Sequence, residues 1–275
     1  MDDIKHLESV SNRLRQLQIE MLHAIGMEHK GHPGPALSIT DIITALYFKV
    51  MKIDPANPRW EDRDRFILSK GHACPALYTA LAEKGYFDKK HLATFRHVDS
   101  MLQGHPDMKK TPGIDMTAGS LGHGLGAGIG IALAARIDGK DYQTYVLVGD
   151  GETQEGLIWE SAMSAGHYGL DNLTLIIDRN RWQSCSAVDC TIDIEPLADK
   201  LISFGWSVNE IDGHDFSQLI KALSAREESK PKAIIAKTIK GKGISFMEED
   251  NSWHQRPITD DEFEKAMAEL KAGEG

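Results

Sequence analysis

The sequence predicts an α/β fold, a doubly wound parallel sheet with helices on both faces. Apolar runs in the second half of the chain are typical of strands buried on both faces. Segments with helical patterns separate these runs, and this alternation indicates a parallel sheet with helical crossovers. The predicted strands are TYVLVG (144–149), LTLIID (173–178), WSVNEI (206–211) and KAIIAK (232–237).

In the first half, apolar residues at steps of three and four predict a first helix. The sequence KGHPGPA (30–36) is expected not to be helical, because two glycines and two prolines lie close together in it. A second helix is expected from Ser38 or Thr40 to about Val50. The first helix is predicted from the apolar face formed by Leu7, Val10, Leu14, Leu17 and Met21.

RFILS (65–69) is a predicted short strand, and Gly85 is a typical stop for the helix before it. The glycine-rich segment 100–130 is expected to be a loop followed by a closely packed helix. The remaining helices are expected over 75–84, 91–97, 155–167, 195–204, 215–228 and 260–271.

The composition limits the classes of protein. The chain has 275 residues, 41% hydrophobic, and a formal charge of −10. These values are typical of a globular protein and suit one large α/β domain. We therefore expect a single domain over 1–275, with an N-terminal helical region over 1–60 packed on it. The acidic balance speaks against nucleic-acid binding, which favours clustered Lys and Arg.

The cysteines and the N-terminus indicate a compartment. Cys74, Cys185 and Cys190 are odd in number and lack a zinc-type spacing, so reduced thiols are expected. The polar start MDDIKHLESV does not resemble a signal peptide. No apolar run reaches the roughly 18 residues of a membrane span. We expect a soluble cytoplasmic protein with no membrane partner.

Two polar residues follow neighbouring predicted strands. Asp150 comes directly after the strand TYVLVG, and Asn180 comes two residues after LTLIID. Ligands of doubly wound folds bind beyond the carboxyl ends of the strands. A carboxylate, an amide oxygen and a backbone carbonyl after Asn180 suit Mg²⁺ or Ca²⁺ together with phosphate oxygens. Gly149 and Gly151 allow the backbone to approach a phosphate.

The sequence GDG alone leaves a second interpretation open. Asp150 could cap the following helix and Asn180 could turn the chain, since glycine-flanked aspartates are common in turns. The 28 residues between Gly151 and Asn180, with a strand before each end, favour a diphosphate and metal site.

GDGETQEG…DRN resembles the thiamine diphosphate motif of transketolases. KGHPGPALS (30–38), LSKGHACPALYTALAEKGYF (68–87) and the glycine-rich stretch over 103–132 resemble the family's histidine-bearing loops, in the same order. DGHDF and KTIKGKG…WH are similar to the end of the same domain. The resemblance covers nearly the whole chain. It implies the N-terminal subunit of a split transketolase, whose pyrimidine-binding and C-terminal domains lie on a partner chain.

The resemblance implies thiamine diphosphate and Mg²⁺, or Ca²⁺ or Mn²⁺, as cofactors. It implies that Asp150, Asn180 and the carbonyl of Trp182 bind the metal, and that Gly151 donates its amide to the diphosphate. Glu155 is expected to orient this loop, whereas Glu152 is expected to be a solvated acid in the first helical turn. The other expected cofactor contacts are His72 on the diphosphate side and Ser120 and Leu121 on the aminopyrimidine.

Three further histidines are expected to act on the sugar. A lone histidine is more often a packing or surface residue, but these lie in loops that match the family. His32 is assigned to proton transfer or hydroxyl binding, His105 to the C1 hydroxyl of the donor, and His254 to donor binding or proton transfer. Ser120 and His123 replace the proline and glutamine usual in the family, so His123 has no assigned role.

The predicted activity is transfer of a two-carbon ketol unit from a ketose phosphate to an aldose phosphate. The expected assembly is a heterotetramer of two such chains and two transketolase C-terminal subunits, which would carry the glutamate that activates the cofactor. The alternatives are a deoxyxylulose-phosphate-synthase-like or 2-oxo-acid dehydrogenase component, and a non-catalytic partner that retained the fold.

Overall fold

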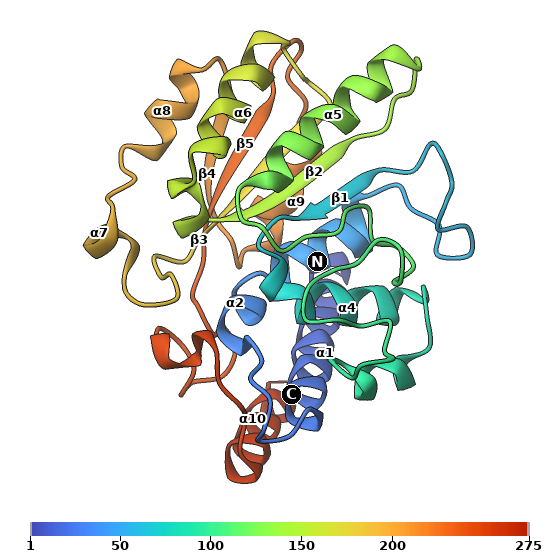
Figure 1. The fold of residues 1–275 in the computed structure, drawn as a ribbon, viewed down its shortest axis with the longest axis vertical. Helices are drawn as coiled ribbons and strands as arrows, with labels where there is room; N and C mark the ends of the chain where they lie inside the picture. The colour runs from blue at the N-terminus through green and yellow to red at the C-terminus, as the bar shows by residue number, and fades with distance from the viewer. Residues whose placement is uncertain (1, 274–275) are drawn as a thin grey trace.

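The computed structural model describes residues 2–273 and has a five-stranded parallel sheet at its centre (Figure 1). All neighbouring strands pair in parallel. The predicted α/β fold with a parallel sheet is therefore confirmed. In spatial order the strands are β1 (Arg65–Leu68), β2 (Thr144–Gly149), β3 (Leu173–Arg179), β5 (Lys232–Lys237) and β4 (Ser207–Asp212).

The register brings the carboxyl ends of the central strands to one edge. Gly149 of β2 pairs with Asp178 of β3, and Asp178 pairs with Ala236 of β5. Asp150 comes one residue after Gly149 and Asn180 two residues after Asp178, so both lie at this edge. The sheet thus places the two predicted metal ligands on adjacent strands.

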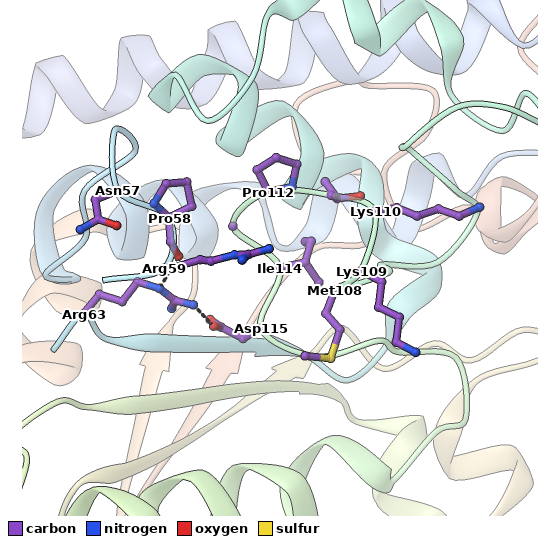
Figure 2. A pocket seen from close by; sticks show the side chains of 12 residues that line it. Asn57, Pro58, Arg59, Arg63, Met108, Lys109, Lys110, Pro112, Ile114 and Asp115 are labelled. Carbon is purple, nitrogen blue, oxygen red and sulfur yellow. Dashed lines mark hydrogen bonds and ion pairs between the residues drawn. The ribbon is translucent and has the colours of Figure 1, made fainter. Parts of the chain in front are cut away.

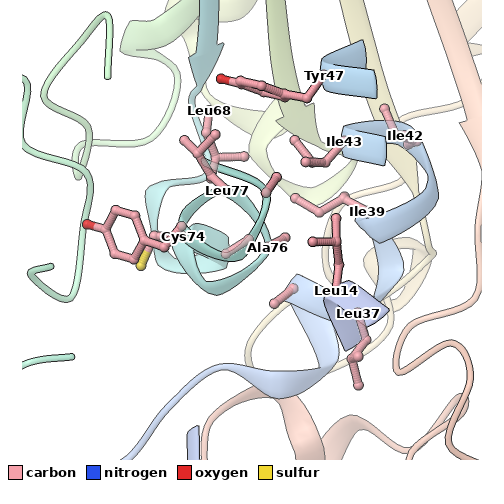
Figure 3. Packing of buried hydrophobic residues seen from close by; sticks show 14 of the residues in the cluster. Leu14, Leu37, Ile39, Ile42, Ile43, Tyr47, Leu68, Cys74, Ala76 and Leu77 are labelled. Atoms are coloured by element: carbon pink, nitrogen blue, oxygen red, sulfur yellow. The ribbon is translucent and has the colours of Figure 1, made fainter. Parts of the chain in front are cut away.

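One face of the sheet packs against the N-terminal helices and α9 in a single hydrophobic cluster. Tyr145, Leu147 and Ile176 point into this cluster from the strands. Figure 3 shows part of it, where Leu14 and Leu77 come from different helices and Ile39 comes from the turn just before Thr40. The helices are α1 (Asp2–Ala24), α3 (Thr40–Ala45), α4 (Cys74–Lys84), α9 (Phe216–Ser224) and α10 (Asp260–Ala272).

The opposite face is covered by α5 (His123–Ile137), α6 (Gly156–His167) and α8 (Leu197–Ser203), which lie together in Figure 1. The alternate strand residues Val146 and Val148 point into this second cluster. Successive strand side chains point to opposite faces of the sheet. Because both sets lie in hydrophobic clusters, both faces of the sheet are buried. The sheet is doubly wound, as predicted. The short α7 (Val188–Thr191), which the sequence did not predict, lies between β3 and α8.

The expectation that the sequence KGHPGPA is not helical was wrong in its second half. Residues Pro33–Ser38 form the short helix α2, with His32 as the residue before it. Proline is tolerated in the first turn of a helix, where backbone N–H groups have no partner within the helix. The two prolines therefore start this helix, and they place His32 at its N-terminal end.

Two other predicted helices differ from the structure. Residues 91–97 were predicted to be helical, but a 3₁₀ segment at Lys89–Thr94 precedes a turn. Only Leu92 of that segment is buried, so little apolar surface is available to stabilise a longer helix. α9 ends at Ser224 instead of 228, because Lys232 donates to the carbonyls of Ala222, Leu223 and Ala225 and thereby satisfies the end of the helix.

The remaining predicted helices are present close to their predicted bounds. α10 begins with a capping box formed by Thr259 and Glu262, and α4 ends at Gly85 in the left-handed conformation. Cys74, Cys185 and Cys190 are all free thiols. Across residues 2–273, no helix combines the length and the apolar character needed to cross a bilayer.

Candidate functional site

A cavity of about 490 Å³ lies at the carboxyl edge of the sheet. It collects residues from the loops after β1, β2, β3 and β5, and from both GHP sequences. Ser120 is exposed and does not line it. The predicted site residues that do line it are His32, His72, His105, Leu121, Asp150, Gly151, Glu155, Asn180, Trp182 and His254.

Asp150 lines this cavity and is 1% exposed. Its carboxylate accepts hydrogen bonds from the backbone N–H of Gly151 at 2.8 Å and of Arg181 at 2.5 Å. Arg179 Nη1 lies 3.1 Å from the second oxygen. Burial, then the nearby charge of Asp178, raises the pKa of Asp150 to about 6. A cation beside a buried carboxylate stabilises its charged form and lowers its pKa.

Asn180 is also buried, and its amide has a fixed orientation. Its Nδ2 donates to Asp178 Oδ2 at 2.6 Å, while its Oδ1 accepts from Trp182 N at 2.9 Å. The amide oxygen therefore points away from Asp178. Asp150 and Asn180 are brought together at one end of the cavity, as the sequence predicted, with Trp182 beside them.

Asp178 is a buried acceptor that joins the loops beneath the cavity. Besides Asn180, it accepts from Ser38 Oγ at 2.8 Å, Thr238 Oγ1 at 2.5 Å and Lys70 Nζ at 2.5 Å. Burial opposes the charge, but Lys70 and these hydrogen bonds hold the pKa of Asp178 below its usual range. The carboxylate is ionised and ties three other chain segments, those of Ser38, Lys70 and Thr238, to the end of β3.

Lys240 supplies a second buried ammonium group. It is 1% exposed, donates to Asn251 Oδ1 at 2.6 Å and lies 2.9 Å from His254 Nδ1. Burial, and then the charge of Lys70, lowers the pKa of Lys240 to about 7. Two lysines thus face one small cavity, where an anionic ligand would offset their mutual repulsion.

Three histidine rings meet in the cavity. The ring centroids of His32 and His72 are 5.2 Å apart, those of His72 and His254 5.4 Å, and those of His32 and His254 5.7 Å. These residues come from the start of α2, the turn after β1 and the segment before α10, so only the fold brings them together.

Burial is the largest cause that keeps these imidazoles neutral. It lowers the pKa of His32 to about 4 and that of His254 to about 3, with Arg96 and Lys240 as the next largest causes respectively. The pKa of His72 is also well below its usual value, through burial and then Lys70. A neutral imidazole can donate one hydrogen bond and accept another, as hydroxyl binding requires.

His105 lies at the exposed rim and joins the other histidines only indirectly. Its ring is beside Gly71, because a Cβ there would lie 3.2 Å from His105 Cδ2. Arg96 has φ 65° and donates to the carbonyl of Lys30 at 2.6 Å. Burial and then the Arg96 charge lower the pKa of His105.

Glu152 was expected to be solvated, and this was wrong. Its side chain is buried, with 4% exposed, and accepts hydrogen bonds from Ser69, Gly122 and Gly149. Glu155, which was expected to orient the loop, is exposed at the cavity, and its role stays a prediction. His123 is exposed at the start of α5, with Nδ1 3.2 Å from the carbonyl of Leu121.

The sequence interpretation missed Lys70 and Lys240, although both stand in stretches that it quoted. The available signal was a lysine directly before or after a glycine-bearing turn in LSKGH and KTIKGKG. No local pattern pairs Lys70 with Asp178, 108 residues away. Within residues 2–273, no group of three His, Cys, Asp or Glu residues is arranged to hold a metal ion. The predicted metal site is not such a group, because Asp150 is its one carboxylate and its other protein ligands are an amide and a carbonyl oxygen.

A second cavity of about 730 Å³ lies between the segments 57–63 and 108–115, and is separate from the histidines (Figure 2). Arg63 is paired with Asp115 at 2.5 Å. Lys109 and Lys110 project in different directions in Figure 2, so the cations do not converge on one point. This cavity therefore lacks the arrangement of an anion site.

The fold and the cavity define a class: a doubly wound α/β protein with a polar ligand site at the carboxyl edge of its sheet. Residues 7–273 match the family model described as transketolase, thiamine diphosphate binding domain. The chain belongs to this family. It is therefore a thiamine diphosphate-binding chain of the transketolase type.

Relatives of known name agree with this assignment. The chain is 45% identical to 6-deoxy-6-sulfo-D-fructose transketolase subunit SqwG of Clostridium sp. (strain MSTE9), with 96% of each chain covered. It is 41% identical to an apulose-4-phosphate transketolase subunit of Phocaeicola vulgatus, over 96% of this chain and 92% of that one. The chain thus spans nearly the full length of relatives named as transketolase subunits.

The structure agrees as well. Transketolase from Campylobacter jejuni superposes with a TM-score of 0.89 at 32% identity, over 96% of this chain and 42% of that chain. The present chain therefore matches about two fifths of that longer transketolase.

Proposed function

We propose that this chain is the cofactor-binding half of a two-carbon ketol transferase that acts with a partner subunit. The observation that supports this most strongly is the joining of Asp150 and Asn180 with two buried lysines and three neutral histidines in one cavity. The partner would carry the pyrimidine-binding and C-terminal domains in a cytoplasmic heterotetramer. The sugars would be a ketose phosphate donor and an aldose phosphate acceptor, including pentose phosphates.

The residues present fit a divalent cation and a diphosphate. Asp150 is a buried carboxylate whose pKa of about 6 would fall beside a cation, and the Asn180 oxygen is held away from Asp178. A Cβ on Gly151 would lie 2.9 Å from Gln183 Cβ, so only glycine fits this close passage. Asp150, Asn180 and the Trp182 carbonyl would hold Mg²⁺, Ca²⁺ or Mn²⁺, which prefer oxygen ligands.

The residues between Asp150 and the histidines would hold the thiamine diphosphate. Gly151 N–H, His72 and Lys240 would bind the diphosphate side, and Leu121 would face the aminopyrimidine. Ser120, predicted to do the same, lies outside the cavity lining and would reach the aminopyrimidine only from its edge. Glu155 would complete the contacts around the loop. The cofactor, when bound, supplies a carbanion equivalent that takes up the two-carbon unit.

The protein's own histidines would act on the sugar hydroxyls. Cleavage of the C2–C3 bond requires a proton to leave a donor hydroxyl, and the acceptor aldehyde oxygen must gain one. His32 and His254, neutral in the cavity, could accept and return that proton at imidazole nitrogens. His105 at the rim would bind the C1 hydroxyl of the donor.

The named substrates of the relatives suggest which donors to assay. One relative is named for 6-deoxy-6-sulfo-D-fructose and another for apulose 4-phosphate. The two names specify different sugars. The corresponding contacts are expected mainly on the partner, so the donor of this chain is best found by assay.

The test combines reconstitution and a single substitution. The chain is mixed with a transketolase C-terminal subunit, Mg²⁺ and thiamine diphosphate, and ketol transfer from a panel of ketose phosphates is measured against pyruvate decarboxylation. We expect transfer from a ketose phosphate only with both subunits. Asp150→Asn should abolish metal-dependent cofactor binding by calorimetry, and wild-type affinity in that variant would refute the metal assignment.

A further inference from the structure

Glu152 is a buried carboxylate with partners on three separate segments. Its Oε1 accepts from Ser69 Oγ at 2.5 Å and from Gly122 N at 2.8 Å, and its Oε2 accepts from Gly149 N at 3.1 Å. Ser69 follows β1, Gly122 precedes α5, and Gly149 ends β2. One side chain thus connects three segments that surround the cavity.

The hydrogen-bond directions show that Glu152 acts only as an acceptor here. The two backbone N–H groups can only donate. Ser69 Oγ already accepts from Gly124 N at 3.1 Å, so its own hydrogen is available for Glu152. The side chain of Glu152 therefore faces three donors, and no residue of another type offers two such acceptor atoms at this length.

The glycines confirm how closely the segments approach. A Cβ on Gly124 would lie 2.4 Å from Ser69 Cβ, and one on Gly122, which has φ +81°, would lie 2.9 Å from Glu155 Cβ. The glycine-rich loop thus rests directly on Ser69 and on the loop that carries Glu155. This close approach leaves Glu152 enclosed among the three segments.

We propose that Glu152 is a positioning residue for the cofactor: it sets the glycine-rich loop at 119–124 relative to the Gly149–Gly151 loop. This inference rests on the proposed function, because it assigns the two loops to opposite ends of one bound thiamine diphosphate. Leu121 precedes Gly122, and Asp150 follows Gly149, so Glu152 controls the distance between the aminopyrimidine and metal contacts. In this proposal Glu152, although it lines the cavity, acts on the loops and not on the sugar or the metal.

The test is the affinity for thiamine diphosphate with Mg²⁺, measured by calorimetry on the full chain with its partner subunit. Glu152→Gln keeps the size of the side chain but places an NH₂ group against an N–H donor. We expect the dissociation constant to rise about tenfold or more, at a temperature where circular dichroism shows the variant folded. Ser69→Ala removes one of the three donors and should raise the dissociation constant by a smaller factor.

Asp64 offers a matched control at the other edge of the sheet. It is 6% exposed and accepts from the backbone N–H of Lys52 and of Gln143, both at 2.8 Å. Because it precedes β1, it is remote from the cavity. Asp64→Asn should lower the thermal stability and leave the cofactor affinity unchanged, which separates positioning from a general effect on folding.

The outcomes are distinguishable. If the wild type binds thiamine diphosphate and folded Glu152→Gln binds it equally well, the positioning role is overturned and the proposed function stands. If Glu152→Gln does not fold, Ser69→Ala decides in the same way. If the wild-type complex binds no thiamine diphosphate, the proposed function fails and this inference fails with it.

Discussion

Lys70 Nζ lies 2.5 Å from Asp178 Oδ2, and the two side chains are only 3% and 0% exposed. Ser69, the preceding residue, donates to Glu152. Two consecutive residues are thus bound to two different buried carboxylates. His72 follows two residues later, so this double attachment determines where its ring lies.

The first prediction concerns this buried ion pair. Lys70→Met leaves the Asp178 charge buried without its cation, and removal of one partner of such a pair costs about 3 kcal/mol or more in the free energy of unfolding. Urea denaturation of the chain measures this. The matched control is Lys49→Met, which breaks the exposed pair with Asp3 and should change the midpoint little. Equal losses in both variants would contradict the prediction.

The second prediction concerns the pH dependence of cofactor binding through Lys240. Its pKa of about 7 is lowered by burial and Lys70, and raised by Asp178 and Asp150. An anionic diphosphate would raise this pKa, so above about pH 7 the empty site must take up a proton on binding. We therefore expect affinity to fall as pH rises above about 7, and to fall also below about pH 6, where Asp150 must lose a proton to bind the cation.

Proton uptake is measured by calorimetry near pH 8 in two buffers that differ in ionisation enthalpy. His32 and His254 have pKa values of about 4 and about 3, so they stay neutral in this range. Lys240→Met should remove the proton uptake and weaken binding. The same uptake in this variant would assign it to another group.

The third prediction separates the rim from the cofactor end. His105→Asn should lower kcat/KM for the ketose donor by about a hundredfold, with the dissociation constant of thiamine diphosphate unchanged, because His105 lies at the exposed rim. His72→Asn should instead raise that dissociation constant. Steady-state kinetics and calorimetry on both variants test this, and the idea fails if His105→Asn weakens cofactor binding as much as His72→Asn.

The fourth prediction uses two glycines of α5. A Cβ at Gly128 would lie 2.4 Å from Val146 Cγ2, whereas one at Gly130 would meet no atom within 4 Å. Gly128→Ala should therefore cost about 1–3 kcal/mol by overpacking. Gly130→Ala should instead raise the free energy of unfolding by up to about 1 kcal/mol, because alanine has a higher helix propensity than glycine. Thermal unfolding of both variants measures the difference, and destabilisation by both would show that the helix tolerates no side chain at either position.

The sheet could be predicted from the sequence because its strands are continuous apolar runs between helical segments. Val146 and Leu147 point to opposite faces of the sheet and are both buried, so the apolar pattern is continuous and needs no knowledge of the contacts. The meeting of Asp150 and Asn180 in one cavity was predictable for a related reason. Asp150 and Asn180 follow adjacent parallel strands, and this geometry brings them to the same edge.

Glu152 shows where local rules stop. An acid in the first turn of a helical segment is usually solvated and favoured there by the helix dipole. The burial of the Glu152 side chain depends instead on its hydrogen bonds with Ser69 and Gly122, which are 83 and 30 residues away. Lys70 and Lys240 were missed for the same reason. The burial of these two lysines depends on tertiary contacts that no spacing in the sequence encodes. The error at Pro33 is of another kind, because a proline in the first turn of a helix follows a local rule.

The two buried carboxylates also divide the cavity into parts that can change independently. Its floor is attached through Asp178 and Glu152 to several segments at once, whereas His105 and Leu121 at its rim are exposed. A substitution in the floor disturbs several loops together, and one at the rim disturbs few contacts. We therefore expect an evolving or engineered chain to accept substitutions at its rim more readily than in the floor, where one change displaces several loops.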